Sequence, residues 1–216
     1  MSTGKFITFE GTEGCGKSTQ VKLLAERLTQ MGHRVHVLRE PGGTPIGEEI
    51  RHTLKHSAQN AAMTPEAELL LMNASRAQLV REIIRPALAA GDIIVSDRFH
   101  DSSTAYQGYG RELSLASVKA IIDFAVGDTR PDLTLLLQVA PAVSVERLRS
   151  RQGTLPFLRD RIEESDQLFF ARAARGFAAI AAAEPQRVHI VNGASSVEAV
   201  AEHIWRLVEP LFSQGR

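Results

Sequence analysis

Residues 6–19 read Phe-Ile-Thr-Phe-Glu-Gly-Thr-Glu-Gly-Cys-Gly-Lys-Ser-Thr, and they carry the strongest signal for a fold class in this chain. Its second half, with Gly11 followed after four residues by Gly16, Lys17 and Ser18, matches the P-loop pattern of nucleotide-binding proteins. The apolar run before it predicts a strand, and the apolar repeat after it predicts an amphipathic helix. A P-loop requires a strand on one side and a helix on the other. The alternative is a glycine-rich turn that only caps a helix.

The P-loop residues have separate expected roles at a bound nucleotide. The glycines permit backbone angles that point successive N–H groups at phosphate oxygens, and the helix N-terminus adds positive potential. We expect Lys17 to reach the β- and γ-phosphates as a catalytic residue, and Ser18 to place its hydroxyl on Mg²⁺. The expected nucleotide-binding residues are Gly11, Thr12, Glu13, Gly14, Cys15, Gly16, Lys17, Ser18 and Thr19.

Short apolar runs alternate with longer helical patterns along the whole chain, which is typical of a parallel sheet covered by helices on both faces. The expected strands are residues 6–10, 34–38, 93–97, 133–139 and 187–191. The expected helices are residues 17–31, a long segment from 65 through 83, 115–126, 143–150, 162–183 and 197–212. We therefore predict an α/β protein with the P-loop NTPase fold, in one domain of residues 1–216.

The third expected strand ends at Asp97, which adds a second candidate metal residue to Ser18. In the usual strand order this carboxylate lies beside the P-loop, where it can orient the Mg²⁺ shell. The alternative is a turn residue that simply follows a strand. Arg98 comes next, and its planar guanidinium suits a second phosphate group better than a lysine would.

Composition limits the classes of partner. Lys plus Arg and Asp plus Glu both number 25, so no global positive field favours a nucleic acid polymer or an anionic membrane. The one cysteine, Cys15, excludes an intrachain disulfide and favours a reducing compartment such as the cytoplasm. The first residues show no secretory signal, and no apolar run has the roughly 20 residues of a membrane span.

A basic segment interrupts the helical pattern between residues 150 and 161. It contains Gly153 and Pro156, and arginines flank it at positions 149, 151, 159 and 161. We expect a mobile flap, or lid, over about 150–161. The alternative is a solvated loop that happens to be basic.

Four stretches together resemble the bacterial thymidylate kinase family over nearly the whole chain: residues 11–19, 39–44, 97–108 and 130–134. The combination is far more specific than the P-loop alone. The resemblance implies a five-stranded parallel core with a short lid and a homodimer. It also implies Mg²⁺ as cofactor, ATP as phosphate donor and dTMP as acceptor.

The resemblance further assigns residues to the acceptor. Arg98 resembles the ligand of the acceptor phosphate, Arg76 the arginine that contacts thymine, and Tyr106 the residue that crowds the 2′ position of the sugar. Met72 stands where the family often has Phe, and a thioether stacks on a base less rigidly than a ring. The full set of expected substrate-binding residues is Glu13, Arg39, Arg51, Met72, Arg76, Arg98, Ser103, Tyr106 and Gln107.

Phosphoryl transfer to an ionised phosphate needs positioning and positive charge, and it needs no general base. The resemblance implies a catalytic arginine that comes either from the P-loop or from the lid. Because this P-loop carries Glu13 and no arginine, we expect the lid to supply that positive charge. The expected catalytic residues are Lys17, Arg98, Arg161 and Arg151, with Arg161 preferred over Arg151. Alternatives are a kinase for another nucleoside monophosphate and a non-catalytic nucleotide-binding module. A GTP-driven switch would need an Asn-Lys-x-Asp segment, which the sequence lacks.

Overall fold

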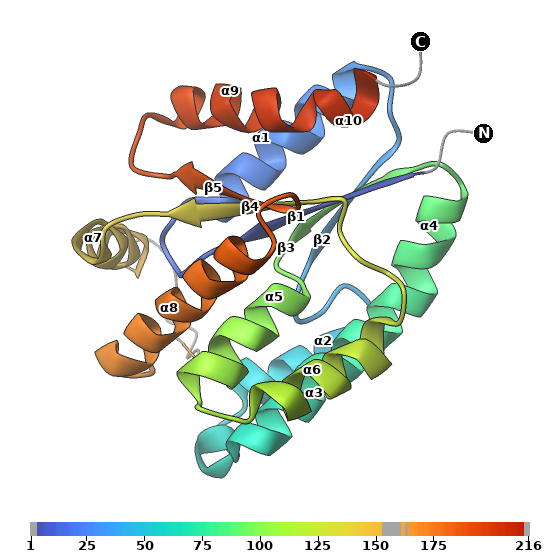
Figure 1. The fold of residues 1–216 in the computed structure, drawn as a ribbon. Helices are drawn as coiled ribbons and strands as arrows, with labels where there is room; N and C mark the ends of the chain where they lie inside the picture. Colours follow the sequence, from blue (N-terminus) through green and yellow to red (C-terminus); the bar gives the residue numbers. More distant parts are fainter. Residues whose placement is uncertain (1–3, 153–160, 163, 214–216) are drawn as a thin grey trace.

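A computed structural model describes residues 4–152, 161–162 and 164–213. Figure 1 shows a central sheet with helices packed on both of its faces. The strands lie in the order β2-β3-β1-β4-β5 and pair in parallel throughout. Their bounds are β1 Lys5–Glu10, β2 Val35–Arg39, β3 Ile93–Asp97, β4 Leu133–Gln138 and β5 Val188–Asn192. The predicted α/β fold with five parallel strands is confirmed.

The central strand β1 carries the P-loop at its carboxyl end, and alternation along it divides the core in two. Ile7 and Phe9 pack against the helices α1 and α9, whereas Phe6 packs on the opposite face. All of these side chains are buried. A strand covered on both faces therefore reads as a continuous apolar run, which explains why the sequence revealed it.

The helices fall into two layers (Figure 1), with α1, α9 and α10 on one face of the sheet. Those of the first layer are α1 Lys17–Gln30, α9 Val197–Val208 and α10 Pro210–Ser213. The opposite face carries α3 Pro65–Leu79, α4 Arg85–Ala89, α5 His100–Ser103, α6 Leu115–Val126 and α8 Gln167–Ala183. Further elements are α2 Pro45–Arg51, α7 Pro141–Gln152, the π-helical turns η1 His52–His56, η3 Val80–Ile84 and η4 Thr104–Gly110, and the 3₁₀ turn η2 Asn60–Ala62.

Two predicted helix bounds are wrong. Helix α8 begins at Gln167 and not at 162, because the Asp166 carboxylate accepts a hydrogen bond from the Phe169 N–H at 2.7 Å and caps the helix there. The predicted helix 197–212 is broken after Val208, and Pro210 opens the short helix α10. Most of the expected lid, residues 153–160, and the side chain of Arg151 lie outside the described residues.

Candidate active site

The loop between β1 and α1 has a backbone that only glycine accommodates at its key positions. Gly11, Gly14 and Gly16 all have positive φ angles, of 132°, 73° and 101°. A Cβ atom on Gly11 would lie 2.3 Å from the Leu137 carbonyl oxygen, so a larger residue would also collide with β4. The loop is therefore shaped as the P-loop pattern predicts, with helix α1 starting directly after it.

Lys17 lies inside this loop and is buried. Its Nζ donates hydrogen bonds to the carbonyl oxygens of Gly11 at 2.9 Å and Thr12 at 3.0 Å. Cys15 is also buried, with its Sγ 3.6 Å from the same nitrogen. The ammonium group is thus held at the centre of the loop, where phosphate oxygens can replace its carbonyl partners.

Ser18 and Asp97 meet at the edge of the sheet, as the sequence predicts. The Ser18 hydroxyl donates to Asp97 Oδ2 at 2.8 Å, and Asp97 is the register partner of Phe9 at the end of β1. A hydroxyl and a carboxylate are hard oxygen donors that suit Mg²⁺. The pair would hold an ion that also takes phosphate oxygens and water.

Arg98 follows the last residue of β3 and lies beside the P-loop, in an unusual backbone conformation. Its φ is 75°, a left-handed value that costs a non-glycine residue about 1–3 kcal/mol. Its N–H donates to the Phe9 carbonyl oxygen at 2.9 Å, and its own carbonyl oxygen accepts from Ser96 Oγ at 2.8 Å. The surrounding structure therefore holds Arg98 in a conformation that the residue does not favour by itself.

The Arg98 side chain crosses from β3 to the P-loop. One guanidinium nitrogen donates to Glu13 Oε1 at 2.7 Å, and the other donates to the Gly11 carbonyl oxygen at 3.1 Å. The Tyr106 hydroxyl donates to the other Glu13 oxygen at 2.9 Å. Arg98, Glu13 and Tyr106 thus form one connected polar cluster beside the P-loop.

Electrostatics keeps the members of this cluster in defined protonation states. Burial disfavours the Glu13 carboxylate, but the positive charges of Arg98 and Lys17 outweigh burial and hold the pKa of Glu13 below its ordinary value. Burial and the neighbouring Glu13 carboxylate raise the pKa of Tyr106 well above its usual range. At neutral pH the cluster is therefore a carboxylate, a guanidinium and a phenol that donates its proton.

A cavity opens next to this cluster, with an empty volume of about 420 Å³ that includes its opening to solvent. Every acceptor residue expected from the sequence lines it except Arg39 and Arg51. Arg39 instead pairs with Glu48 at 2.9 Å and lies on a groove shared with Ser18 and Asp97. Arg51 donates to the carbonyl oxygen of Pro41 at 2.9 Å. Pro41 lines the cavity, so Arg51 contacts the cavity wall without lining the cavity itself.

Arg76 forms a buried wall of the cavity, with an exposed fraction of 2%. It donates to Glu40 Oε2 at 2.8 Å and to Ser103 Oγ at 2.9 Å. It also donates to the Phe99 carbonyl oxygen at 3.0 Å. Burial raises the pKa of Glu40 although Arg76 opposes the rise. Glu40 was not singled out from the sequence, because nothing in a Glu-Pro-Gly-Gly segment reveals a partner 36 residues away.

A second buried carboxylate, Glu68, contacts both Gln107 of the cavity wall and Arg161, the last residue of the expected lid. It accepts hydrogen bonds from Gln107 at 2.7 Å and from Arg111 at 3.0 Å. Arg161 also pairs with Glu68 and donates to the Met63 carbonyl oxygen at 2.8 Å. Arg161 therefore lies on the side of the cavity that Gln107 lines, and its expected catalytic role stays a prediction.

Helix α7 contacts the P-loop through two residues that sequence reasoning missed. Ser144 Oγ donates to the Glu13 carbonyl oxygen at 2.6 Å. Arg147 donates to the carbonyl oxygens of Gly14 at 3.4 Å and Gly193 at 3.1 Å. Arginines are common on exposed helix faces, so no local signal separated Arg147 from its neighbours.

Comparisons with known proteins show the family to which this fold belongs. A family model described as thymidylate kinase matches residues 9–204. The chain belongs to the thymidylate kinase family. It is similar to the thymidylate kinase of Geobacter sulfurreducens, with 47% identity over 92% of this chain and 93% of that protein. It is also similar to a thymidylate kinase of Synechococcus sp., with 46% identity over 95% of each chain.

Among solved structures, the crystal structure of thymidylate kinase from Ehrlichia chaffeensis matches with a TM-score of 0.77 and 31% identity. The match covers 96% of this chain and 99% of that one. Membership in the thymidylate kinase family confirms the interpretation of the P-loop as that of an ATP-binding kinase, a transferase of nucleotide biosynthesis. Among the described residues, no helix has the length and apolar character needed to cross a membrane.

Proposed function

We propose that this protein transfers the γ-phosphate of ATP to dTMP, giving dTDP and ADP. The observation that carries the proposal is the cluster of Arg98, Glu13 and Tyr106, which connects the P-loop to the cavity lined by Arg76 and Gln107. Donor and acceptor phosphates bound at these two places would approach each other at Arg98. The names of the relatives support the same reaction.

In the proposed reaction an oxygen of the acceptor phosphate attacks the γ-phosphorus, and the bond to the bridging oxygen of ADP breaks. Because the attacking oxygen is already ionised, no side chain has to remove a proton. Lys17 and Arg98 hold positive charge against the donor and acceptor oxygens. Ser18 and Asp97 would hold Mg²⁺, which when bound neutralises phosphate charge.

Acceptor selectivity follows from the walls of the cavity. Tyr106 and Glu13 lie where a sugar would enter beside the acceptor phosphate, and a bulky phenol there favours deoxyribose. Arg76, Ser103 and Gln107, with the side chain of Met72, line the deeper part expected to take thymine. This arrangement favours dTMP over ribonucleotides and over larger bases.

We also propose that lid arginines complete the positive charge around the transferring group. Arg161 and Arg151 are the candidates, with Arg161 first. Arg161 would have to exchange its pairing with Glu68 for phosphate oxygens when substrates bind. Closure of a lid over ATP would exclude water as well.

The test is a coupled assay that follows ADP with dTMP, dUMP, AMP, CMP and GMP as acceptors. We expect dTMP to react faster than dUMP, and both much faster than the three ribonucleotides. A best rate with AMP would assign the protein to another nucleoside monophosphate. ATP binding without turnover of any acceptor would favour a non-catalytic module.

Two further proposals concern the assembly and its compartment. We propose a homodimer, because α6 exposes Phe124 at 85% and α3 exposes Leu70 at 56% to solvent, and a second copy of the chain would cover them. Sedimentation of wild type and Phe124→Asp should show a dimer that the substitution weakens.

We also propose a cytoplasmic location, where Cys15 stays a free thiol. Fractionation of cells would test this.

A further inference from the structure

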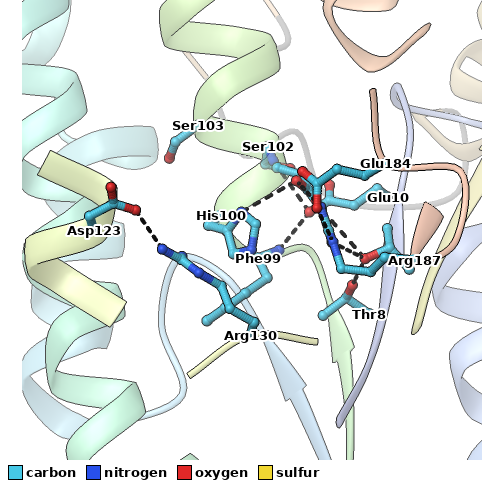
Figure 2. A network of polar contacts seen from close by, with 12 residues as sticks. Thr8, Glu10, Phe99, His100, Ser102, Ser103, Asp123, Arg130, Glu184 and Arg187 are labelled. Carbon is cyan, nitrogen blue, oxygen red and sulfur yellow. Dashed lines mark hydrogen bonds and ion pairs between the residues drawn. The ribbon is translucent and has the colours of Figure 1, made fainter. Parts of the chain in front are cut away.

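Glu10, the last residue of β1, is fully buried beneath the active site. Its Oε1 accepts hydrogen bonds from the backbone N–H groups of Phe99 at 2.8 Å and Ser102 at 3.3 Å. Its Oε2 accepts from Ser102 Oγ at 2.6 Å. Figure 2 shows Glu10, Phe99 and Ser102 joined in this way. The carboxylate therefore accepts three hydrogen bonds from one short segment.

That segment begins immediately after Arg98. The N–H of Phe99 follows the carbonyl group of Arg98, so its bond to Glu10 holds one side of the left-handed residue. The bond from the Arg98 N–H to the carbonyl oxygen of Phe9 holds the other side. Adjacent residues of β1 thus clamp the backbone of Arg98 from both directions.

Ser102 extends the contact to the guanidinium. Its hydroxyl donates to Glu10 and accepts from an Arg98 nitrogen at 3.1 Å. Because a hydroxyl has one proton, a strong acceptor at Glu10 orients the Ser102 lone pairs toward Arg98. A carboxylate without contact to the cavity can therefore fix both the backbone and the side chain of Arg98.

We propose that Glu10 is a positioning residue that holds Arg98 in the geometry needed to bind the acceptor phosphate. The inference rests on the proposed function, since it assumes that Arg98 contacts this phosphate. Glu10 does not line the cavity itself. Its effect must pass through Phe99, Ser102 and Arg98.

The contacts that Arg187 makes in Figure 2 belong to a different part of the fold. Asp101 lies in the same helical turn, yet its carboxylate accepts two hydrogen bonds from Arg187, at 2.7 and 2.9 Å. Arg187 in turn donates to Thr134 on β4 and to Glu184. This part of the network joins the helical turn to β4 and the start of β5, whereas Glu10 bonds to Phe99 and Ser102 beside Arg98.

Burial of the Glu10 carboxylate also has a cost. Burial raises its pKa to about 7, the nearby Asp101 carboxylate adds to the rise, and Arg98 opposes it. A neutral amide of the same size would avoid the burial of charge, but it has one acceptor oxygen and could not accept hydrogen bonds on both sides. Only a carboxylate therefore accepts from the Phe99 N–H and from the Ser102 hydroxyl at the same time.

The test is a double-mutant cycle with Glu10→Gln, Arg98→Ala and the double variant, measured by steady-state kinetics with dTMP and ATP. We expect Glu10→Gln to lower kcat/KM for dTMP about tenfold and to leave KM for ATP within about twofold. In the Arg98→Ala background the same substitution should change kcat/KM less than twofold. An equal loss in both backgrounds would overturn the proposal. Asp92→Asn, a buried carboxylate at the opposite end of β3, is the matched control.

Ser102→Ala keeps the test decisive if Glu10→Gln does not fold. It removes the hydroxyl between Glu10 and Arg98 and should also lower kcat/KM for dTMP more than it changes KM for ATP. Wild-type kinetics for Ser102→Ala would overturn the proposal that Glu10 acts on Arg98 through Ser102. Failure of wild type to phosphorylate dTMP would instead contradict the proposed function. Normal wild-type activity, with loss in Arg98→Ala and no loss in Glu10→Gln, would contradict this inference alone.

Discussion

The phosphate loop and the acceptor cavity lie side by side but are built in different ways. The loop is one continuous segment, residues 11–16, whose binding groups are backbone N–H groups shaped by glycines. The cavity takes its charged side chains from separate segments. Its arginines are paired with carboxylates, Arg98 with the partly buried Glu13 and Arg76 with the buried Glu40. A substitution in the loop removes a ligand, whereas one in the cavity also leaves a buried charge without its partner.

The largest expected effect is that of Lys17→Ala. It removes the one side-chain cation of the P-loop, so we expect kcat to fall at least about 100-fold. Thermal unfolding should stay close to that of wild type, because the Lys17 ammonium donates its hydrogen bonds to carbonyl oxygens of its own loop, those of Gly11 and Thr12. Near wild-type turnover would contradict the role of the loop, and loss of the folded state would contradict the separation of loop from core.

Arg98→Ala tests the cavity side of the comparison. We expect kcat/KM for dTMP to fall about 100-fold, with KM for ATP nearly unchanged. Because Glu13 loses its charge partner, the free energy of unfolding should also fall by about 3 kcal/mol, measured in urea. Lys22→Ala, which breaks an exposed pair with Glu26, is the control and should cost less than about 1 kcal/mol. Equal loss of affinity for both substrates would argue against an acceptor role.

The lid arginines sharpen the boundary between the two regions. If Arg161 and Arg151 stabilise the transferring group, each change to Ala should lower kcat by about 10- to 100-fold and change KM for ATP little. Arg175→Ala, on the exposed face of α8, is the control. Because Arg161 pairs with Glu68 beside Gln107, a rise in KM for dTMP at constant kcat would assign Arg161 to the cavity wall instead.

The pH dependence of the free energy of unfolding tests the burial of the Glu10 carboxylate. The folded-state pKa of Glu10, about 7, lies above its ordinary value of 4.5. Glu10 therefore favours folding fully only below pH 4.5, and this contribution is lost as the pH rises through 7. Relative to wild type, Glu10→Gln should gain up to about 3 kcal/mol of stability between pH 4.5 and 8 in urea titrations. A difference that stays constant over this range would contradict the expected titration.

The smallest expected effect concerns Met72, which lines the cavity and is nearly buried. Met72→Phe supplies the flat ring that a base stacks on, worth about 0.5–1 kcal/mol. We therefore expect KM for dTMP to fall two- to fivefold, with kcat and KM for ATP unchanged. A raised KM would mean that the cavity has no room for the ring.

The sequence by itself determined the features that depend on neighbouring residues. The P-loop, its glycines and the strand and helix around it are local, and their spacing alone specifies the phosphate site. The buried strands were predicted within one or two residues, because apolar runs bounded by turns persist in a parallel sheet. The start of α8 was missed because the apolar pattern continues through Ile162, while the Asp166 cap sets the boundary.

Tertiary structure alone decided which charges meet. Glu10 contacts Phe99 across 89 residues, and Arg161 contacts Glu68 across 93, so no local pattern could pair them. The parallel sheet brings Glu10 and Phe99 together, because it places the carboxyl ends of β1 and β3 side by side at one edge. Burial there then requires each carboxylate to find donors. The sequence shows which ionisable side chains are present. Which of them form pairs depends on the folded structure, because only folding removes the water that would otherwise solvate each charge.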